Sequence, residues 1–369
     1  MTNHSRSEEN EVPSGSFSAV DEWVAFCDTL KSTGVEILQS ANALDDVNRA
    51  EGLRYLTRMV RGAIEKFVEY VDPLDPVMYK TADERTGHGG DNPDQMYSVS
   101  PVVDSEVYEL RGNRGTAWDF NFNVFNYRPD NRYDLLARLE SKDLVSDANG
   151  DFRLVIGGER SGDNWLPLPP GANQVKLRQI FRDRGTEQPV ALTIHRLTEN
   201  AQAAPLSLEA IIRRFERAKT YFSKSVRIFY SWTRDFLETT NRLPAMSPEW
   251  IAKGGGEPNA SFFMSSWKIS PDEALVIELP TIAEDKLWSL AIYNHWLESM
   301  DYVNFRIHTN SAMARRNSDG SCTVVIANRD PGFGNWLNAT GHTQGNMILR
   351  TWTGGQPPPE PQTRIVSLK

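Results

Sequence analysis

The segment from Tyr293 to Tyr302 holds the residues of this sequence that are best suited to proton transfer. An imidazole and two carboxylates, those of His295, Glu298 and Asp301, lie close together in it. A carboxylate beside an imidazole raises its pKa and fixes its tautomer, so such a group can supply both a base and an acid. We therefore predict that these three residues take part in catalysis.

Further candidates lie downstream of this segment. Asp330 stands before a Pro-Gly turn, His342 follows an Asn-Trp-Leu motif, and Arg350 can serve as the partner of an anion or oxyanion. Nearby aromatic and amide side chains are predicted to bind the substrate: Tyr293, Trp296, Tyr302, Asn335, Trp336 and Trp352. The plainer alternative is that all of these are loop and strand residues with satisfied hydrogen bonds.

The spacing of the candidate ligands predicts neither a metal nor an organic cofactor. His295, His308 and His342 with nearby carboxylates are numerous enough for a metal site, but no His-x-His or His-Glu-x-x-His spacing places two ligands together. The glycine-rich segment 87–90 lacks the Gly-Lys-Ser/Thr ending of a phosphate loop. Neither a Rossmann fingerprint nor a Gly-x-Ser-x-Gly elbow occurs, so nicotinamide and ordinary serine hydrolase chemistry have no support.

An internal repeat organises the chain around these candidates. Residues 149–197 and 319–368 align almost without gaps, and an Asn-Trp-Leu motif recurs at 164–166 and 335–337. The copies extend upstream, so that they span roughly 90–200 and 256–369. We interpret the shared pairs as structural residues: Asn164 and Asn335, Trp165 and Trp336, Arg178 and Arg350. The candidates of segment 293–302 attract attention because the first copy has different residues there, at 123–132.

Each copy reads as a β-rich unit. Short runs with alternating polarity are separated by Gly, Pro and Asn turns, and the run 118–124 places Trp118, Phe120, Phe122 and Val124 inward with Asp119, Asn121 and Asn123 on the other face. Asn-Gly and Asp-Gly before apolar runs are hairpin signals. This pattern predicts two antiparallel β-sandwich or jelly-roll units, with a cleft for a ligand at their junction.

Helical periodicity surrounds the first unit. Apolar residues recur at three and four over 19–40 and again after Asp45 and Asp46, which predicts an antiparallel helical pair joined at 41–43. A long helix capped by Ser207 follows, with a basic face that we interpret as solvated. The expected organisation is a disordered tail (1–17), a helical region (18–86), a first β unit (87–205), a linking helix (206–243) and a second β unit (244–369).

Composition narrows the class of protein further. The 369 residues carry a net charge of −9, which argues against a nucleic acid as partner. No stretch is apolar enough to span a membrane, and the polar N-terminal sequence predicts a cytoplasmic protein. Cys27 and Cys322 are expected to be free buried thiols. The sequence does not indicate whether the protein forms a homo-oligomer.

Several stretches resemble a bacterial family known as domain of unknown function 1214. They are DNPDQMY at 91–97, Asn-Trp-Leu-Pro at 164–167, DPGFGNWLNATGH at 330–342, Trp-x-x-Phe-Cys at 23–27 and Arg-x-Leu-Thr-Arg at 54–58. The resemblance covers nearly the whole chain and implies a tandem jelly-roll fold similar in architecture to peptide:N-glycanase F. It implies no reaction and no catalytic residues, because a fold does not determine a function.

From these observations we expect an enzyme that needs no cofactor and performs acid–base chemistry on a small apolar or sugar-bearing molecule in the cleft between the β units. One alternative is a glycan- or lipid-binding protein without catalysis, its groove lined by Trp288, Trp296, Trp336 and Trp352. The other is a hydrolase of glycosidic or amide bonds, which requires carboxylates from both copies to face one cleft.

Overall fold

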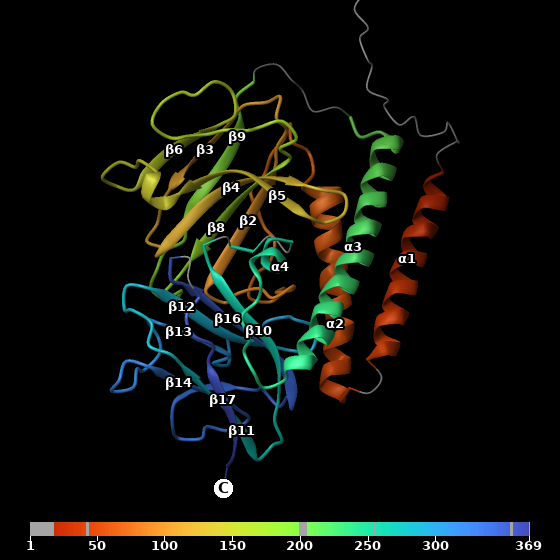
Figure 1. Ribbon diagram of the computed structural model, residues 1–369. Coiled ribbons are helices and arrows are strands. Elements are labelled where there is room, and N and C mark those ends of the chain that lie inside the picture. Colours follow the sequence, from red (N-terminus) through yellow and green to blue (C-terminus); the bar gives the residue numbers. More distant parts are fainter. Residues whose placement is uncertain are drawn as a thin grey trace, which may run out of the picture.

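The computed structural model describes residues 18–41, 44–198, 205–253, 256–257, 259–354 and 357–368. The predicted tail 1–17, most of the predicted link at 41–43 and most of the Gly254-Gly255-Gly256 stretch lie outside these residues. Two β units stacked on one another make up most of the molecule, and helices lie along one side of both (Figure 1). This is the predicted fold class, mainly β with an N-terminal helical region and a long helix between the units.

The first β unit consists of two sheets. One has the strand order β1-β2-β8-β4-β5 and the other β7-β6-β3-β9. The bounds of these strands are β1 Tyr79–Lys80, β2 Gln95–Pro101, β3 Tyr108–Asn113, β4 Asp119–Tyr127, β5 Tyr133–Glu140, β6 Asp151–Ile156, β7 Trp165–Leu166, β8 Gln174–Ile180 and β9 Ala191–Arg196.

The second β unit repeats this arrangement. Its sheets have the orders β10-β16-β12-β13 and β15-β14-β11-β17. Every strand of the first unit except β1 therefore has a counterpart in the second. The bounds are β10 Ser261–Lys268, β11 Glu273–Leu279, β12 Leu287–Tyr293, β13 His308–Asn310, β14 Cys322–Ala327, β15 Asn335–Asn338, β16 Gln344–Trp352 and β17 Gln362–Ser367. The repeat seen in the sequence is therefore present in the strand order. The pairing is antiparallel except for β6 with β7 and β14 with β15, which are parallel.

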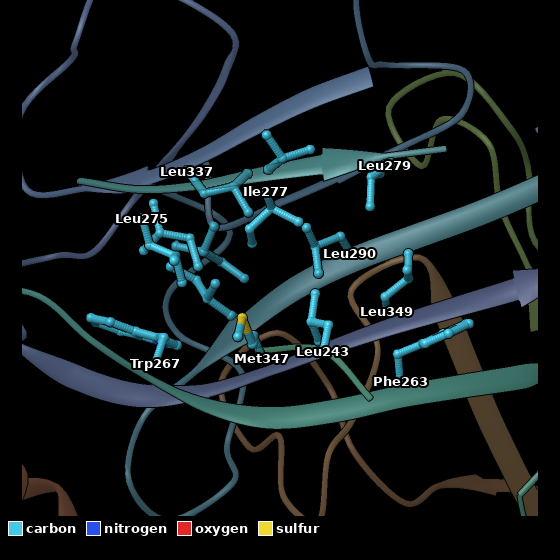
Figure 2. Close-up of a cluster of buried hydrophobic side chains, with 14 of the residues drawn as sticks. Leu243, Phe263, Trp267, Leu275, Ile277, Leu279, Leu290, Leu337, Met347 and Leu349 are labelled. Atoms are coloured by element: carbon cyan, nitrogen blue, oxygen red, sulfur yellow. The ribbon is translucent and has the colours of Figure 1, made fainter. Parts of the chain in front are cut away.

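Each unit has its own hydrophobic core between its two sheets. Figure 2 shows the second core, where Trp267 and Met347 from one sheet meet Leu275 and Ile277 from the other. Alternation along the strands produces this arrangement, because every second side chain of a strand points to the same face. The fully buried aromatic side chains make the core dense, and burying one such side chain stabilises a fold by roughly 1.5–3 kcal/mol.

Strand β4 follows the predicted alternation on one face only. Phe120, Phe122 and Val124 lie in the first core as expected. Asn121 and Asn123 on the other face were expected to be exposed, but only 1% and 2% of their surfaces are accessible. Trp118 packs at the contact between the units and not in the core. A sheet that is buried on both faces has lost the signal that distinguishes inside from outside.

Three long helices form a layer along the β units. They are α1 Ala19–Ser40, α2 Asp46–Ile64 and α3 Leu208–Phe236, and a π-helical turn Glu65–Glu69 extends α2. Ser18, Asp45 and Ser207 cap them by accepting hydrogen bonds from backbone N–H groups, as predicted for the last two. The short helix α4 Pro248–Lys253 follows α3. In Figure 1, α3 runs from the first β unit to the second and lies beside α1 and α2.

Two expectations about side chains of the helices need correction. Lys219, assigned to a solvated basic face of α3, is buried because that part of α3 packs on α1, where Lys219 Nζ lies 2.9 Å from a carboxylate oxygen of Glu22. Cys27, expected to be buried, is exposed on α1, whereas Cys322 is buried. Among the helices that the structure describes, none is long and apolar enough to cross a bilayer.

Candidate functional site

Two adjoining cavities lie where the β units meet next to α3. The smaller, of about 190 Å³, is lined by both units and by α4, and we call it the interunit chamber. The larger, of about 450 Å³, lies between the first unit, α2 and α3, and we call it the helix chamber. Residues lining both are Thr81, His88, Gly89, Lys176 and Trp232. The two chambers are therefore parts of one cleft.

Strand alternation delivers the charged side chains to this cleft. On β8, Val175 and Leu177 point into the first core, so Lys176 and Arg178 point to the opposite face. On β16 the same alternation turns Arg350 away from the second core. Lys176, Arg178 and Arg350 all line the interunit chamber.

Lys176 is an amine held between aromatic rings without a counter-ion. Its Nζ lies 4.6 Å from the ring centre of Tyr133 and 5.0 Å from that of Phe125. It makes no hydrogen bond or ion pair within the described part of the chain. Burial, and then the charge of Arg178, lower the pKa of Lys176 to about 7, although Glu257 acts in the opposite direction. Near neutral pH this amine is present in both its neutral and its protonated form.

A second amine, that of Lys66, approaches the cleft from the π-helical turn. Its Nζ lies 3.3 Å from the ring centre of Tyr127 and donates a 3.2 Å hydrogen bond to the hydroxyl of Tyr133. Burial lowers the pKa of Lys66 well below its usual range, and the charges of Lys176 and Arg217 lower it further. The ring of Tyr133 is thus in contact with both amines.

Glu257 lines the interunit chamber and connects the two β units. It belongs to the segment that leads into β10, and its carboxylate forms ion pairs with Arg178 and with Arg138, the latter at 2.7 Å. Burial alone would raise the pKa of Glu257, but the two guanidinium groups outweigh it and lower this pKa. The carboxylate therefore stays ionised and is occupied by its partners.

Arg350 is a buried cation on the second unit's side of the chamber. Only 4% of its surface is accessible, and its guanidinium donates hydrogen bonds to the Tyr293 hydroxyl, at 2.8 Å, and to the carbonyl oxygen of Gly90. No carboxylate of the described residues forms an ion pair with it. Asp91 faces the same chamber and accepts hydrogen bonds from the backbone N–H and the hydroxyl of Ser299. Gly90 adopts a φ of 74°, a conformation that glycine tolerates, and this brings the chain against Arg350.

Of the predicted catalytic residues, only Arg350 lines the cleft. Tyr293, which was predicted to bind the substrate, accepts a hydrogen bond from Arg350. His295 packs edge-on against Trp296 and Tyr230, and burial lowers the pKa of His295 to about 4. The indole N–H of Trp296 donates a 2.7 Å hydrogen bond to the carbonyl oxygen of Asn48 on α2.

Two other predicted catalytic residues also bind the helix α2. The buried Glu298 forms a 2.8 Å ion pair with Arg58, and His342 Nε2 lies 2.9 Å from a carboxylate oxygen of Glu51. Burial raises the pKa of Glu298 to about 7, whereas the hydrogen bond and charge of Glu51 outweigh burial and raise the pKa of His342. Together with Trp296, these residues attach the second β unit to α2, whereas the corresponding segment 123–132 of the first unit contacts the π-helical turn and α3 through Tyr127 and Asn131.

The remaining predicted residues lie elsewhere. Asp301 and Asp330 accept hydrogen bonds from backbone N–H groups in exposed turns. Tyr302 stacks with Arg184 and lines a small side pocket. Trp352 packs between the units. Asn335 and Trp336 each bond to neighbouring backbone carbonyls, as do Asn164 and Trp165 in the first copy.

Sequence reasoning missed Lys66, Lys176 and the loop at 87–90 as parts of the cleft. One signal was present for Lys176. The alignment of the copies places Lys176 opposite Ile348, just before the shared Leu-Arg pair. Lys176 is special to the first copy in the same way as His295 is special to the second, so the repeat marks both residues equally. No comparable signal exists for Lys66, because a lysine on a helical face is ordinarily solvated.

Comparisons with known proteins identify relatives without a known activity. The family model described as "Protein of unknown function (DUF1214)" matches residues 268–356. The crystal structure of an uncharacterised protein from Burkholderia cenocepacia is 34% identical, with a TM-score of 0.89 over 94% of this chain and 97% of that chain. A protein from Vibrio parahaemolyticus is 11% identical over 94% of this chain and all of its own, with a TM-score of 0.47. None of the curated proteins matches this sequence.

Proposed function

The chain belongs to the DUF1214 family, and from the geometry of its cleft we propose that it is an enzyme performing acid–base chemistry on a small molecule without an organic cofactor. The reacting molecule lies in the cleft between the β units, as expected from the duplication. Lys176, and not the segment 293–302, supplies the proton-transfer group.

The observation that supports this proposal most is the state of Lys176. Its amine faces a cavity, has no partner in the described residues, and has a pKa of about 7. A group with a pKa near the working pH is the most effective general acid or base, since both protonation states are populated. Structural lysines are usually exposed and charged, so a lysine in this environment marks a candidate site.

The neighbouring groups fit the two halves of a proton transfer. The ammonium form of Lys176, which the ring of Tyr133 and the charge of Glu257 stabilise, donates a proton to the bound molecule. Lys66 and the Tyr133 hydroxyl, joined by a hydrogen bond, form a second pair that can take up a proton. Such positioned proton transfer contributes roughly a 10²–10⁴-fold rate enhancement.

The lining of the cleft supports a substrate with an apolar part. Rings from several elements line it, among them those of Tyr97, Tyr133, Phe229, Trp232 and Trp250. Flat aromatic walls favour flat apolar groups or sugar rings.

Substitution of Lys176 tests the proposal. Purified wild-type protein, Lys176→Met and Lys142→Met, which removes an exposed lysine, are incubated with a small-molecule extract of cells and the metabolites are profiled by mass spectrometry. We expect the wild type and Lys142→Met to convert the same compound, and Lys176→Met to convert it at least about 100-fold more slowly. Loss of turnover in His295→Ala with wild-type turnover in Lys176→Met would instead favour the site predicted from the sequence.

The hydrolase alternative has one observation in its favour. Asp91 from the first unit and Glu257 from the second both face the interunit chamber, as that alternative requires. Glu257 is engaged by two arginines that lower its pKa, so it is unsuited to donate a proton. If the alternative holds, Asp91→Asn abolishes cleavage of the substrate and Lys176→Met leaves it intact. Retained ligand binding without any product would favour the non-catalytic binding protein.

A further inference from the structure

The side chains that face the cleft carry unbalanced positive charge. Glu257 is neutralised by Arg138 and Arg178, Glu65 by Arg61, and Asp130 by Arg132. The cations left without an ion pair among the described residues are Lys66, Lys176 and Arg350. Asp91 is the carboxylate of the cleft that forms no ion pair with a described residue. The cleft is therefore cationic when its lysines are protonated, although the whole chain has a net charge of −9.

Arg350 makes this imbalance significant. A guanidinium of which 4% is accessible has lost most of its hydration, and a buried charge is costly unless a counter-charge or full hydrogen bonding replaces the water. Its neutral partners Tyr293 and Gly90 replace only part of that hydration. The side chain is held rigidly at the wall of the interunit chamber, so an anion entering the chamber meets a preformed partner.

The two lysines respond to the same imbalance. The charge of Arg178 lowers the pKa of Lys176, and the charge of Lys176 lowers the pKa of Lys66. An anion placed among these cations would remove the repulsion and stabilise both ammonium groups. Binding of an anion should then be coupled to proton uptake by the protein.

The shape and lining of the cleft restrict the rest of the ligand. The interunit chamber holds about 190 Å³ and opens into the helix chamber of about 450 Å³. The ring centre of Phe262 lies 5.6 Å from the guanidinium carbon of Arg350, and the rings of Trp232 and Trp250 line the same chamber. A ligand with a small anionic group beside Arg350 and a flat apolar group against the aromatic rings fits these two chambers better than a long chain or a highly charged molecule.

We propose that the cleft binds a small organic carboxylate with a flat apolar body, its carboxylate held by Arg350 and Lys176 and its body against the aromatic wall. This inference deepens the proposed function, on which it rests for the role of the bound molecule as substrate. Against the effect of burial, the charge of the Asp91 carboxylate helps to raise the pKa of Arg350, but this carboxylate is held by the Ser299 backbone N–H and hydroxyl and forms no ion pair with Arg350.

Binding of phenylacetate and of its neutral analogue phenylacetamide, measured by isothermal titration calorimetry, tests the proposal. We expect phenylacetate to bind the wild-type protein at least about 10-fold more tightly than phenylacetamide, since a charge-assisted hydrogen bond stabilises by roughly 1.5–3 kcal/mol. Equal affinity for the two compounds would overturn the role of the carboxylate. Tighter binding of decanoate than of phenylacetate would overturn the preference for a flat apolar group.

Three variants locate the binding. Arg350→Met and Lys176→Met are expected to weaken phenylacetate binding at least about 10-fold. Arg213→Met, which removes a solvent-exposed arginine of α3, should leave it unchanged. Unchanged affinity in both cleft variants would contradict the proposal.

A measurement on the wild type alone guards against a variant that does not fold. Phenylacetate titrations at pH 7.5 in buffers of different ionisation enthalpy report the protons exchanged on binding. We expect net uptake, because the amine of Lys176 becomes fully protonated in the complex. The charged and titratable groups around that amine are Arg178 on its own strand, Glu257 from the second unit, Lys66 from the π-helical turn, His88 from the loop and Tyr133 on β5. Zero proton exchange, or proton release, would show that the carboxylate does not bind beside the amine of Lys176.

The two proposals fail separately. If phenylacetate and related carboxylates bind at the cleft but no carboxylate in a cell extract is converted, the binding inference stands and the enzymatic proposal fails. If a neutral molecule is turned over in a Lys176-dependent way and carboxylates do not bind, the enzymatic proposal stands and the binding inference fails.

Discussion

Arg178 on β8 and Arg350 on β16 occupy the same position in the two β units, and both side chains line the chamber between the units. Each follows a leucine that points into its own core. The duplication therefore places two guanidinium groups in one cavity, one from each copy. Glu257 forms an ion pair with the first, whereas the hydrogen-bond partners of the second are neutral and the Asp91 carboxylate acts on it only through its charge. The residue two positions earlier differs as well, since Lys176 in the first copy corresponds to Ile348 in the second.

The state of Lys176 has a measurable effect on stability. Its folded-state pKa of about 7 lies below its ordinary value of 10.5, so folding opposes protonation. Below pH 7 the group is protonated in both states and the destabilisation is complete; it disappears as the pH rises from about 7 to about 10.5. We expect Lys176→Met to be more stable than the wild type at pH 6, and the difference to shrink by about 2 kcal/mol towards pH 10, after allowance for water in the chamber.

Denaturant unfolding of both proteins at pH 6, 8 and 10 checks this expectation. Lys142→Met, at an exposed site, is the matched control and should follow the wild type at every pH. A constant difference between Lys176→Met and the wild type would mean that this amine titrates as it does in water.

Much of the fold could be predicted from the sequence because its signals are local or repeated. The cap residues Asp45 and Ser207, the helix 19–40 and the second Asn-Trp-Leu motif all appear where expected. What could not be predicted is which polar faces become buried. Asn121 and Asn123 alternate with core residues as an exposed face does, yet they lie under another part of the protein. Tertiary packing of that kind leaves no trace in periodicity.

The site was harder to predict for a related reason. His295, Glu298 and His342 differ from their counterparts in the first copy. Glu298 and His342 bind α2, and His295 packs on Trp296, whose indole N–H also binds α2. A residue special to one copy therefore indicates an asymmetric environment, which is provided here by the helices as well as by the cleft. Only the tertiary structure brings Lys176, Lys66 and Arg350 to one cleft, through the approach of β8, the π-helical turn and β16.

Glu298 should make the contact with α2 sensitive to pH. Burial raises its pKa to about 7 from an ordinary 4.5, although Arg58 and Asn294 act in the opposite direction. Between pH 4.5 and pH 7 the unfolded chain has lost a proton that the folded protein keeps, so stability falls as the pH rises through this window. Relative to Glu298→Gln, which cannot titrate, we expect the wild type to lose about 3 kcal/mol across it. Urea unfolding between pH 4 and pH 8 measures the difference, and the exposed variant Glu284→Gln should show no such slope.

The shared asparagines give a matched pair of stability tests. Asn335 accepts a hydrogen bond from the backbone N–H of Arg315 and donates to the carbonyl oxygens of Arg315 and Thr323, and Asn164 makes the equivalent bonds in the first unit. Asn335→Ala should cost about 2–3 kcal/mol of unfolding free energy, and the less buried Asn164→Ala about 1–2 kcal/mol. Phenylacetate binding should be unchanged in both. Weaker binding in a folded Asn335→Ala protein would return this residue to the substrate site.

Two glycines of α2 separate packing from helix propensity. A Cβ at Gly52 would lie 2.5 Å from the buried ring of Trp296, which cannot move freely because its indole N–H is bonded to Asn48. A Cβ at Gly62 would meet nothing closer than the Tyr221 ring at 4.0 Å. Alanine gains about 1 kcal/mol over glycine inside a helix, whereas overpacking costs roughly 1–3 kcal/mol. We therefore expect Gly62→Ala to stabilise the protein and Gly52→Ala to destabilise it by up to about 2 kcal/mol, as measured by denaturant unfolding. If both variants gain stability equally, the contact between α2 and Trp296 is loose, and the attachment of the second unit to the helices must depend on Glu298 and His342 instead.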